Sequence, residues 1–315
     1  MYKGRRICAV VPAFNEERLI ERTLCSMPDL VDRTYVVDDG SSDGTAGLAL
    51  SMAEVDERIQ LIAHDRNMGV GAAIASGYKA ALAGGMDIAV VMAGDDQMDP
   101  AAMTSLLDPI VGGRVDYSKG NRLFSREYWQ GMSRWRFVGN AMLTFLTKIS
   151  SGYWDLMDPQ NGYTAISRRA LESIDVDSLY PGYGYCNDLL VKLNVYGFRA
   201  VDVVIPARYG DEKSKIKYRM YIPKVSLLLL CDFFWRLKVK YICMDFHPLV
   251  LFYILGVVLV PLGMLVAIYS IYYKFVLGGS LFIRGVLSFL ILILGMQFLF
   301  FAMLFDMQDN NREER

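Results

Sequence analysis

The sequence contains few of the residues that build zinc sites and disulfide frameworks. Its 315 residues include five cysteines and two histidines, and no two cysteines have the CxxC spacing. Zinc sites and disulfide frameworks need several thiols or imidazoles at short, regular spacing. The pattern therefore argues against both and favours reduced thiols in a cytosolic domain.

An excess of one charge is also absent. The 33 basic residues nearly balance the 34 acidic ones, and the net charge is -1. Because proteins that bind nucleic acid through bulk charge carry a positive excess, no nucleic-acid partner is expected. The apolar run that ends at Pro12 is shorter than the core of a signal peptide. We therefore expect the N-terminal part of the chain to stay in the cytoplasm.

Short apolar runs are present at regular intervals in the first hundred residues. They cover residues 7–11, 35–37, 59–63 and 88–92, with helix-like segments between them. Runs of this length are typical of buried strands. Strands that alternate with helices predict an α/β fold with a mostly parallel sheet covered on both faces. A less regular part follows, with a helix expected over roughly 133–150 and a strand at 200–205.

The fourth apolar run leads into a cluster of acidic residues. Residues 93–100 read AGDDQMDP, and Pro100 opens a helix. Open α/β sheets bind ligands at the carboxyl ends of their strands. Asp95, Asp96, Gln97 and Asp99 would present oxygen atoms there, and such atoms suit a divalent cation. The alternative is a solvated turn in which Asp99 caps the next helix.

Two further loops at strand ends are polar or rich in glycine. Residues 38–45 read DDGSSDGT, which is typical either of a ligand-facing loop or of a turn with a helix cap. Gly69 and Gly71 begin like a dinucleotide-binding fingerprint, but Ile74 replaces the third glycine. We therefore predict that these glycines permit close helix packing.

Hydrophobic residues make up 53% of the chain and concentrate after residue 225. The uncharged stretches 248–273 and 285–305 are each long enough to cross a hydrocarbon core, which needs about 20 residues. Between residues 215 and 240, basic residues flank apolar ones, as in helices that lie in an anionic membrane interface. Lys and Arg gather before the first span, so both ends of the chain are expected in the cytoplasm.

Four regions follow from this pattern. We predict a cytosolic domain at 1–217, interfacial helices at 218–246, a two-helix transmembrane hairpin at 247–306 and a cytosolic tail at 307–315. Small residues in the spans leave room for packing against a second copy of the chain, namely Gly256, Gly263 and Gly295.

The ordered motifs resemble those of family 2 glycosyltransferases with the GT-A fold. The segments that carry the resemblance are 11–17 (VPAFNEE), 37–45 (VDDGSSDGT), Asn67 with Gly69 and Gly71, and 95–100 (DDQMDP). Residues 158–163 and 208–215 resemble later motifs of the dolichol-phosphate mannose synthase branch. That branch includes bacterial polyprenyl-phosphate glucosyltransferases with two C-terminal spans. The resemblance covers about residues 5–220.

The resemblance implies a transferase that moves a hexosyl group, with inversion, from a UDP- or GDP-linked sugar to dolichyl or undecaprenyl phosphate. The product would form at the cytoplasmic face of the cell membrane or of an endomembrane. The nucleotide pocket would be lined by Pro12, Phe14 and Glu16, and Asp39 would accept a hydrogen bond from the base.

The resemblance also implies how the two phosphates are held. Asp95 and Gln97 would bind Mg²⁺ or Mn²⁺ against the donor pyrophosphate. Cationic side chains would hold the acceptor phosphate, because arginine grips phosphate through two parallel hydrogen bonds. The candidates are Arg122, Arg134, Arg208 and Lys215, with Arg136 as an alternative to Arg134. Asp158 matches an aspartate that would act as a base or as an orienting group.

The sequence departs from the family pattern at the expected metal site. Ala93 occupies the position of the first aspartate in the Asp-x-Asp motif. One carboxylate and Gln97 would hold a cation weakly unless the donor pyrophosphate supplies most of the ligands. Two other functions remain open, namely glycosyl transfer to a different acceptor and a membrane-anchored scaffold that binds a nucleotide sugar.

Overall fold

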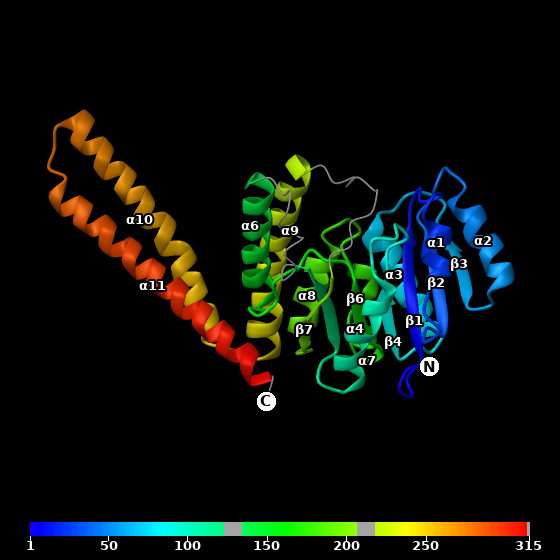
Figure 1. The fold of residues 1–315 in the computed structure, drawn as a ribbon. Helices are drawn as coiled ribbons and strands as arrows, with labels where there is room; N and C mark the ends of the chain where they lie inside the picture. Colours follow the sequence, from blue (N-terminus) through cyan, green and yellow to red (C-terminus); the bar gives the residue numbers. More distant parts are fainter. Residues whose placement is uncertain (123–133, 207–217, 314–315) are drawn as a thin grey trace. The chain divides into compact units, whose positions relative to one another are not determined.

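The computed structural model describes residues 1–122, 134–206 and 218–313, and the chain divides into two compact units, Met1–Phe233 and Phe234–Arg315. The first unit contains a seven-stranded sheet with the strand order β3-β2-β1-β4-β6-β5-β7 (Figure 1). The strands are β1 (Ile7–Ala13), β2 (Arg33–Asp38), β3 (Ile59–Ala63), β4 (Ile88–Val91), β5 (Tyr117–Asn121), β6 (Thr164–Ser167) and β7 (Ala200–Val204). The five runs predicted as strands coincide with β1 to β4 and β7 within two residues at either end.

The sheet is mostly parallel, as predicted. Strands β1, β2, β3 and β4 form parallel neighbours, and so do β5 and β7. Only β6 runs the other way among the described strands, antiparallel to both β4 and β5. The carboxyl ends of β1, β2 and β4 therefore meet at one edge, where the acidic residues were expected.

Helices cover both faces of the sheet (Figure 1). Alternate residues of β1 point to opposite faces, and they enter two separate cores. Cys8 and Val10 pack in the core beneath α3, α7 and α8, whereas Ile7, Ala9 and Val11 pack in the core beneath α1, α2 and α4. These helices are α1 (Ile20–Cys25), α2 (Thr45–Val55), α3 (Val70–Ala83), α4 (Met103–Val111), α7 (Arg168–Ser173) and α8 (Tyr185–Val195).

The remaining described helices of this unit are α6 (Arg134–Ser151), the start of α9 (Tyr218–Lys238) and two short 3₁₀ turns, η1 (Pro100–Ala102) and η2 (Val176–Ser178). Val225 and Leu229 of α9 are buried against Leu143 of α6. The α6 helix confirms the helix expected over roughly 133–150.

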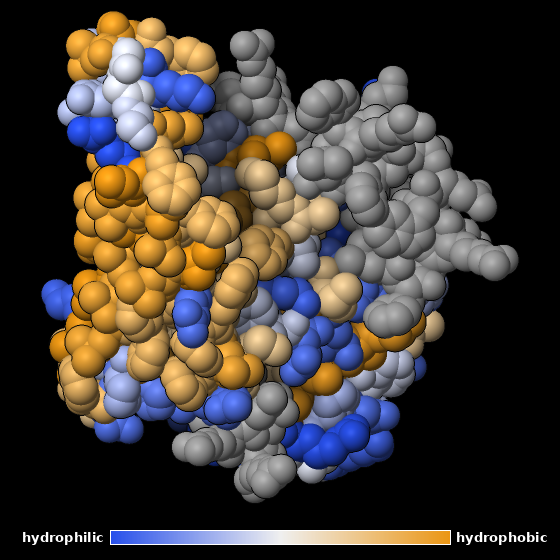
Figure 2. All heavy atoms as spheres, turned by 90° about the vertical axis from the view of Figure 1, so that its left-hand side faces the viewer, coloured by the Kyte–Doolittle hydropathy of each residue, from blue (hydrophilic) through white to orange (hydrophobic). Residues whose placement is uncertain are grey.

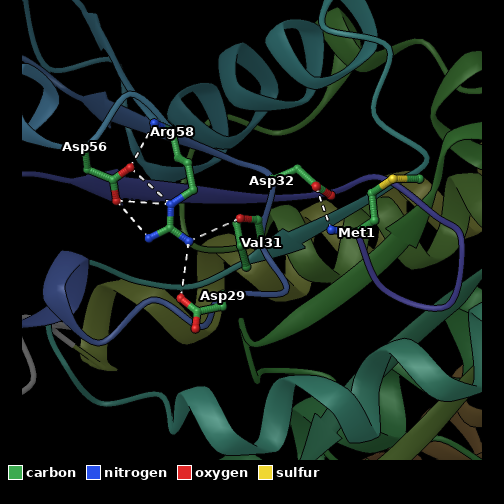
Figure 3. A network of polar contacts seen from close by, with 6 residues as sticks. All are labelled: Met1, Asp29, Val31, Asp32, Asp56 and Arg58. Carbon is green, nitrogen blue, oxygen red and sulfur yellow. Dashed lines mark hydrogen bonds and ion pairs between the residues drawn. The ribbon is translucent and has the colours of Figure 1, made fainter.

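Ion pairs fasten the amino-terminal edge of the sheet, on the side away from the acidic loop. Arg58, just before β3, contacts both oxygens of Asp56, the carbonyl of Val31 and the carboxylate of Asp29 (Figure 3). Asp32, just before β2, binds the terminal amine of Met1 at 2.6 Å and the Ile7 amide at 2.8 Å. These contacts fix the starts of β1, β2 and β3 relative to one another, and leave the opposite edge for ligands.

The second unit is a helical hairpin preceded by a short π-helix, η3 (Val239–Met244). Helices α10 (Leu249–Leu277) and α11 (Phe282–Glu313) pack along each other. The segments Leu249–Leu277 and Phe282–Asp309 are each long and apolar enough to cross a membrane. Many of their large hydrophobic side chains are exposed, and Figure 2 shows the resulting hydrophobic surface in orange.

The glycines of the hairpin lie where its two helices contact each other. A methyl group on Gly256 would lie 2.6 Å from Leu299, and one on Gly295 would lie 2.9 Å from the Val260 backbone. Gly263 meets Leu292 in the same way at 2.8 Å. These glycines therefore let α10 and α11 approach each other, and they give no support to the expected packing against a second copy.

Candidate active site

Three loops meet at the carboxyl edge of β1, β2 and β4. Gly94 donates from its backbone N–H to the carbonyl of Pro12 at 3.2 Å, and Asp39 donates to the carbonyl of Ala13 at 2.9 Å. The Asn15 amide donates to the Ser41 hydroxyl at 2.9 Å. The segments 11–17, 38–45 and 93–100, which the sequence places far apart, thus form one surface.

The three carboxylates of the acidic loop have different surroundings. Asp96, in a left-handed conformation with φ of 54°, forms an ion pair of 2.9 Å with Arg22 of α1. Asp99 caps η1 by accepting from the Ala101 amide at 3.1 Å, so the predicted helix cap is present. Asp95 accepts from the Gln97 amide at 3.1 Å. The loop is therefore both a capped turn and an acidic surface, and Asp95 is the carboxylate that η1 and α1 do not use.

A pocket opens beside this loop. Its lining includes Asp95 and Gln97 from the acidic loop and also Arg122, Asn161 and Tyr163. The Tyr163 hydroxyl donates to the Asp99 carbonyl at 2.9 Å, so β6 fixes the position of the acidic loop. The pocket therefore brings oxygen ligands and a guanidinium group together from segments that flank β4, β5 and β6.

The residues at the expected metal site fit a cation that is held only in part by protein. Asp95 and Gln97 offer side-chain oxygens to one pocket, and hard divalent cations take about six oxygen ligands. Ala93, at the position of the missing carboxylate, donates its N–H to the Met98 sulfur at 3.2 Å. Among the described residues there is no group of three or more His, Cys, Asp or Glu side chains that could hold a metal. Most ligands would have to come from a bound diphosphate and water.

Asp39 lies at the end of β2 and is almost fully buried. Its oxygens accept from the Met68 and Gly69 amides, each at 2.8 Å, and lie 2.8 Å from Nδ1 of His64. A carboxylate offers about four lone pairs, so one remains for a further donor. Of the other residues predicted for the nucleotide, Phe14 is exposed, Pro12 lies near the end of β1 and accepts from the Gly94 amide, and the Glu16 amide donates to Thr45.

Gly69 and Gly71 pack closely, as predicted. A methyl group on Gly71 would lie 2.0 Å from the carbonyl of Tyr180, and one on Gly69 would lie 2.4 Å from the carbonyl of Pro181. The Gly71 amide donates to the same Pro181 carbonyl at 2.7 Å. The glycines therefore join the start of α3 to the segment before α8.

Arg122 follows β5 and binds Asp158, which is 3% exposed. Nε and Nη2 of Arg122 donate to the two carboxylate oxygens at 3.0 and 3.5 Å. Burial alone raises the pKa of Asp158, but the charges of Lys119 and Arg122 and hydrogen bonds from Arg122 outweigh burial and lower the pKa below its usual range. The pair therefore presents an anchored guanidinium to the pocket.

The side chains of the other predicted phosphate ligands lie outside the described residues. Arg134 is the first residue of α6, and its side chain, like that of Arg136, lies outside the described residues. Arg208 and Lys215 also lie outside them. The grouping of these cations with Arg122 stays a prediction.

The sequence reasoning missed Lys119 and Asp202, which lie behind Asp158. Lys119 is fully buried in β5, and its Cα pairs with that of Asp202 in β7. Asp202 is a charged residue inside the strand expected at 200–205, whereas residues 117–122 are consistent with either a strand or a loop. The pairing of those strands, however, could not be seen in the sequence.

Comparisons with known proteins agree with the fold. The open sheet with its acidic edge is that of GT-A glycosyltransferases. Residues 8–175 match the model of glycosyl transferase family 2. The chain belongs to this family and is a glycosyltransferase.

Several relatives resemble the chain over most of their length. A UDP-N-acetylglucosamine–dolichyl-phosphate N-acetylglucosaminyltransferase of Methanococcus voltae is 30% identical over 71% of this chain and 98% of the relative. A polyprenol monophosphomannose synthase of Mycolicibacterium smegmatis is 28% identical over 64% of this chain and 77% of its own. An undecaprenyl-phosphate 4-deoxy-4-formamido-L-arabinose transferase of Proteus mirabilis is 25% identical over 96% of this chain and 88% of its own.

A solved structure shares the fold. Glucosyl-3-phosphoglycerate synthase of Mycobacterium tuberculosis, in complex with Mn²⁺, UDP and its product, superposes with a TM-score of 0.55 at 22% identity. The match covers 75% of this chain and 81% of that one.

Proposed function

We propose that the enzyme transfers a hexosyl group from a UDP- or GDP-linked sugar to the phosphate of a membrane polyprenyl phosphate. The observation that carries the proposal is the pocket whose lining combines Asp95 and Gln97 with the anchored Arg122. The apolar hairpin supports a lipid acceptor, because its exposed side chains suit a bilayer. Relatives whose names state dolichyl or undecaprenyl phosphate support the same acceptor.

The transfer needs one bond to form and one to break at the anomeric carbon. A phosphate oxygen of the acceptor forms a bond to that carbon from one side, while the bond to the donor diphosphate breaks on the other, so the configuration inverts. A phosphate monoester is largely dianionic near pH 7, since its second pKa is about 6. A strong general base is therefore unnecessary, and we assign Asp158 an orienting role, because both of its oxygens already bind Arg122.

The side chains of the pocket have separate tasks in this proposal. Arg122 holds the anionic acceptor beside the anionic donor and offsets their repulsion. Asp39 uses its remaining lone pair for an N–H of the base. Asp95 and Gln97 hold Mg²⁺ or Mn²⁺, which supplies Lewis-acid stabilisation of the departing diphosphate. Arg134, Arg208 and Lys215 complete the acceptor site.

The membrane arrangement is part of the proposal. Both ends of the chain and the sheet domain lie on the cytoplasmic side, and the loop between α10 and α11 lies on the other. The interfacial segment 218–246 then brings the domain to the surface where the lipid phosphate lies.

A donor panel tests the proposed function. The purified full chain in detergent is incubated with polyprenyl phosphate and UDP- and GDP-linked hexoses and N-acetylhexosamines, with and without a chelator. Mass spectrometry of the lipid should show addition of one sugar from one donor class, lost with chelator and strongly reduced in Asp95→Asn. Calorimetric binding of a donor without any transfer would favour the scaffold function instead, and a product on a lipid without phosphate would favour the different acceptor.

A further inference from the structure

Lys119 is a lysine whose burial the proposed reaction does not yet explain. It is 0% exposed, and its Nζ has no hydrogen-bond partner among the described residues. A buried ammonium group without hydrogen bonds destabilises the folded protein relative to an apolar side chain. A lysine at this position therefore needs a reason beyond packing.

The groups that face Lys119 are mostly acidic and come from several elements. Asp202 of β7 is its partner in the strand register, and side chains of such partners lie on the same face of a sheet. Asp158 precedes β6, Arg122 follows β5 and Cys186 belongs to α8, and all three interact electrostatically with Lys119. Burial lowers the pKa of Lys119, while the two carboxylates oppose that effect.

The two carboxylates are held in different ways. One oxygen of Asp202 accepts from Asn121 at 2.8 Å and from the Met157 amide at 2.6 Å, whereas the other has no hydrogen-bond partner among the described residues. Both oxygens of Asp158 instead bind Arg122. Because Asp202 pairs with Lys119 in the strand register and binds the amide next to Asp158, Lys119 lies in the same cluster as the carboxylate that anchors the pocket arginine.

We propose that Lys119 is a positioning residue: from its buried position beside Asp202 it holds Asp158 in place, so that Asp158 keeps the Arg122 guanidinium directed at the anionic acceptor in the pocket. An indirect role for Lys119 fits the structure, because Arg122 lines the pocket and Lys119 does not. The inference rests on the proposed function for the nature of the acceptor. It concerns binding of a phosphate monoester and can be tested apart from sugar transfer.

The test measures binding of farnesyl phosphate to the full chain in detergent, by calorimetry between pH 3.5 and 8. Lys119→Met removes the charge but keeps the length of the side chain, and Lys119→Arg restores a charge. Lys79→Met is the matched control, because Lys79 of α3 pairs with exposed Asp177 and lies outside this cluster. The ionisation of farnesyl phosphate itself is common to all variants and cancels in the comparison.

Loss of the Lys119 charge raises the pKa of Asp158, so Asp158 becomes protonated at higher pH. We expect Lys119→Met to move the acidic decline of farnesyl phosphate binding upward by about one pH unit, which weakens binding about tenfold relative to the wild type on that acidic limb. Lys119→Arg should recover much of the affinity, Lys79→Met should behave like the wild type, and binding of UDP with Mg²⁺ should change far less. A merely structural lysine would weaken both ligands alike without moving the pH dependence.

Several results would overturn the inference. They are a pH dependence in Lys119→Met equal to that of the wild type, an equal loss of UDP affinity, or a wild type that does not bind farnesyl phosphate. If Lys119→Met fails to fold, Asp158→Asn is measured in its place. It must show the same loss of affinity for farnesyl phosphate, and its binding must not decline at acidic pH. A wild type that binds farnesyl phosphate but makes no glycolipid would refute the proposed function and leave this inference to be decided by the binding series.

Discussion

At the residue scale, the acidic loop combines a capped turn with the residues proposed to hold a metal ion. Asp96 pairs with Arg22, Asp99 caps η1, and Asp95 with Gln97 faces the pocket. Ala93 stands where a second carboxylate of the family motif would be. If a cation binds as proposed, the residue at position 93 determines how many carboxylate ligands the protein provides.

Restoring that carboxylate should tighten metal use. In Ala93→Asp, a second anionic ligand should lower the Mn²⁺ concentration for half-maximal transfer by about tenfold, because added carboxylates tune the affinity of hard cations. Ala93→Asn has nearly the same size without the charge and serves as the control. Equal metal requirements in the wild type and Ala93→Asp, measured by titration of chelated enzyme, would show that residue 93 does not face the ion.

The sequence identified the residues that carry motifs, but it did not identify the residues that support them. Asp39, Asp95 and Gln97 follow apolar runs directly, so their gathering at one edge could be predicted from parallel strand order. Lys119 and Asp202 meet only because β5 and β7 are neighbours, and no local pattern reveals that pairing. The same limit applies to His64, whose contact with Asp39 depends on how β3 lies beside β2.

At the scale of elements, α9 carries an acidic group whose ionisation opposes packing. Burial, helped by the carboxylate of Asp188 in α8 and opposed by the ammonium of Lys192, raises the pKa of Asp232 to about 7 from 3.8. The folded protein therefore binds a proton that the unfolded chain releases at lower pH. The resulting stabilisation is complete below about pH 4 and is lost as the pH rises through 7.

Asp232→Asn should remove this dependence. We expect its melting temperature to exceed that of the wild type at pH 8, with the difference shrinking toward pH 5. Thermal unfolding in detergent across this range measures it, and Asp175→Asn, in an exposed turn before η2, is the control. Parallel curves for the wild type and Asp232→Asn would contradict the assignment.

A buried ion pair joins the end of α9 to the end of α11 within the second unit. Arg236 is fully buried and binds both oxygens of Asp306 at 2.8 Å, and the Tyr241 hydroxyl of η3 donates to Asp306 at 2.7 Å. Breaking such a pair leaves an uncompensated buried charge and costs about 3–5 kcal/mol, whereas replacing both partners costs much less. The pair thus fixes the base of the hairpin.

Single and double variants separate these two effects. Asp306→Asn should markedly lower the temperature at which α10 and α11 unfold, while Arg236→Met combined with Asp306→Leu should recover most of the loss. Circular dichroism in detergent gives the transition temperatures. A double variant less stable than Asp306→Asn would contradict this account. It would mean that the attraction within the ion pair stabilises the hairpin, and not merely the absence of an uncompensated buried charge.

The elements themselves were largely predictable. Five strands and both apolar helices follow from runs of hydrophobic residues, since burial on both faces or in lipid leaves little room for polar side chains. The reversed direction of β6 could not be read, because an antiparallel strand of four residues has no distinct pattern. The contacts of the hairpin glycines could not be read either, because sequence does not say which helix a small residue faces.

At the scale of the whole molecule, the proposed topology places the sheet domain and both chain ends on one side of the membrane. The loop between α10 and α11 contains Ser280, which is exposed. Ser280→Cys in intact cells should react with a membrane-impermeant thiol reagent. The natural exposed cysteines Cys25, Cys231 and Cys243 should react only after the cells are opened.

A reversed pattern would place the pocket on the wrong side for nucleotide sugars of the cytoplasm. Labelling of the natural cysteines in intact cells, with protection of the residue at 280, would therefore contradict the membrane arrangement without touching the fold.

The central claim is that the acceptor is a lipid phosphate. The most direct measurement compares polyprenyl phosphate with the corresponding polyprenol as acceptors for the purified full chain and one active nucleotide sugar. The account predicts a glycosylated product from the phosphate, with the mass of one added sugar, and none from the alcohol. Equal products from both lipids, or a product from the alcohol alone, would contradict it.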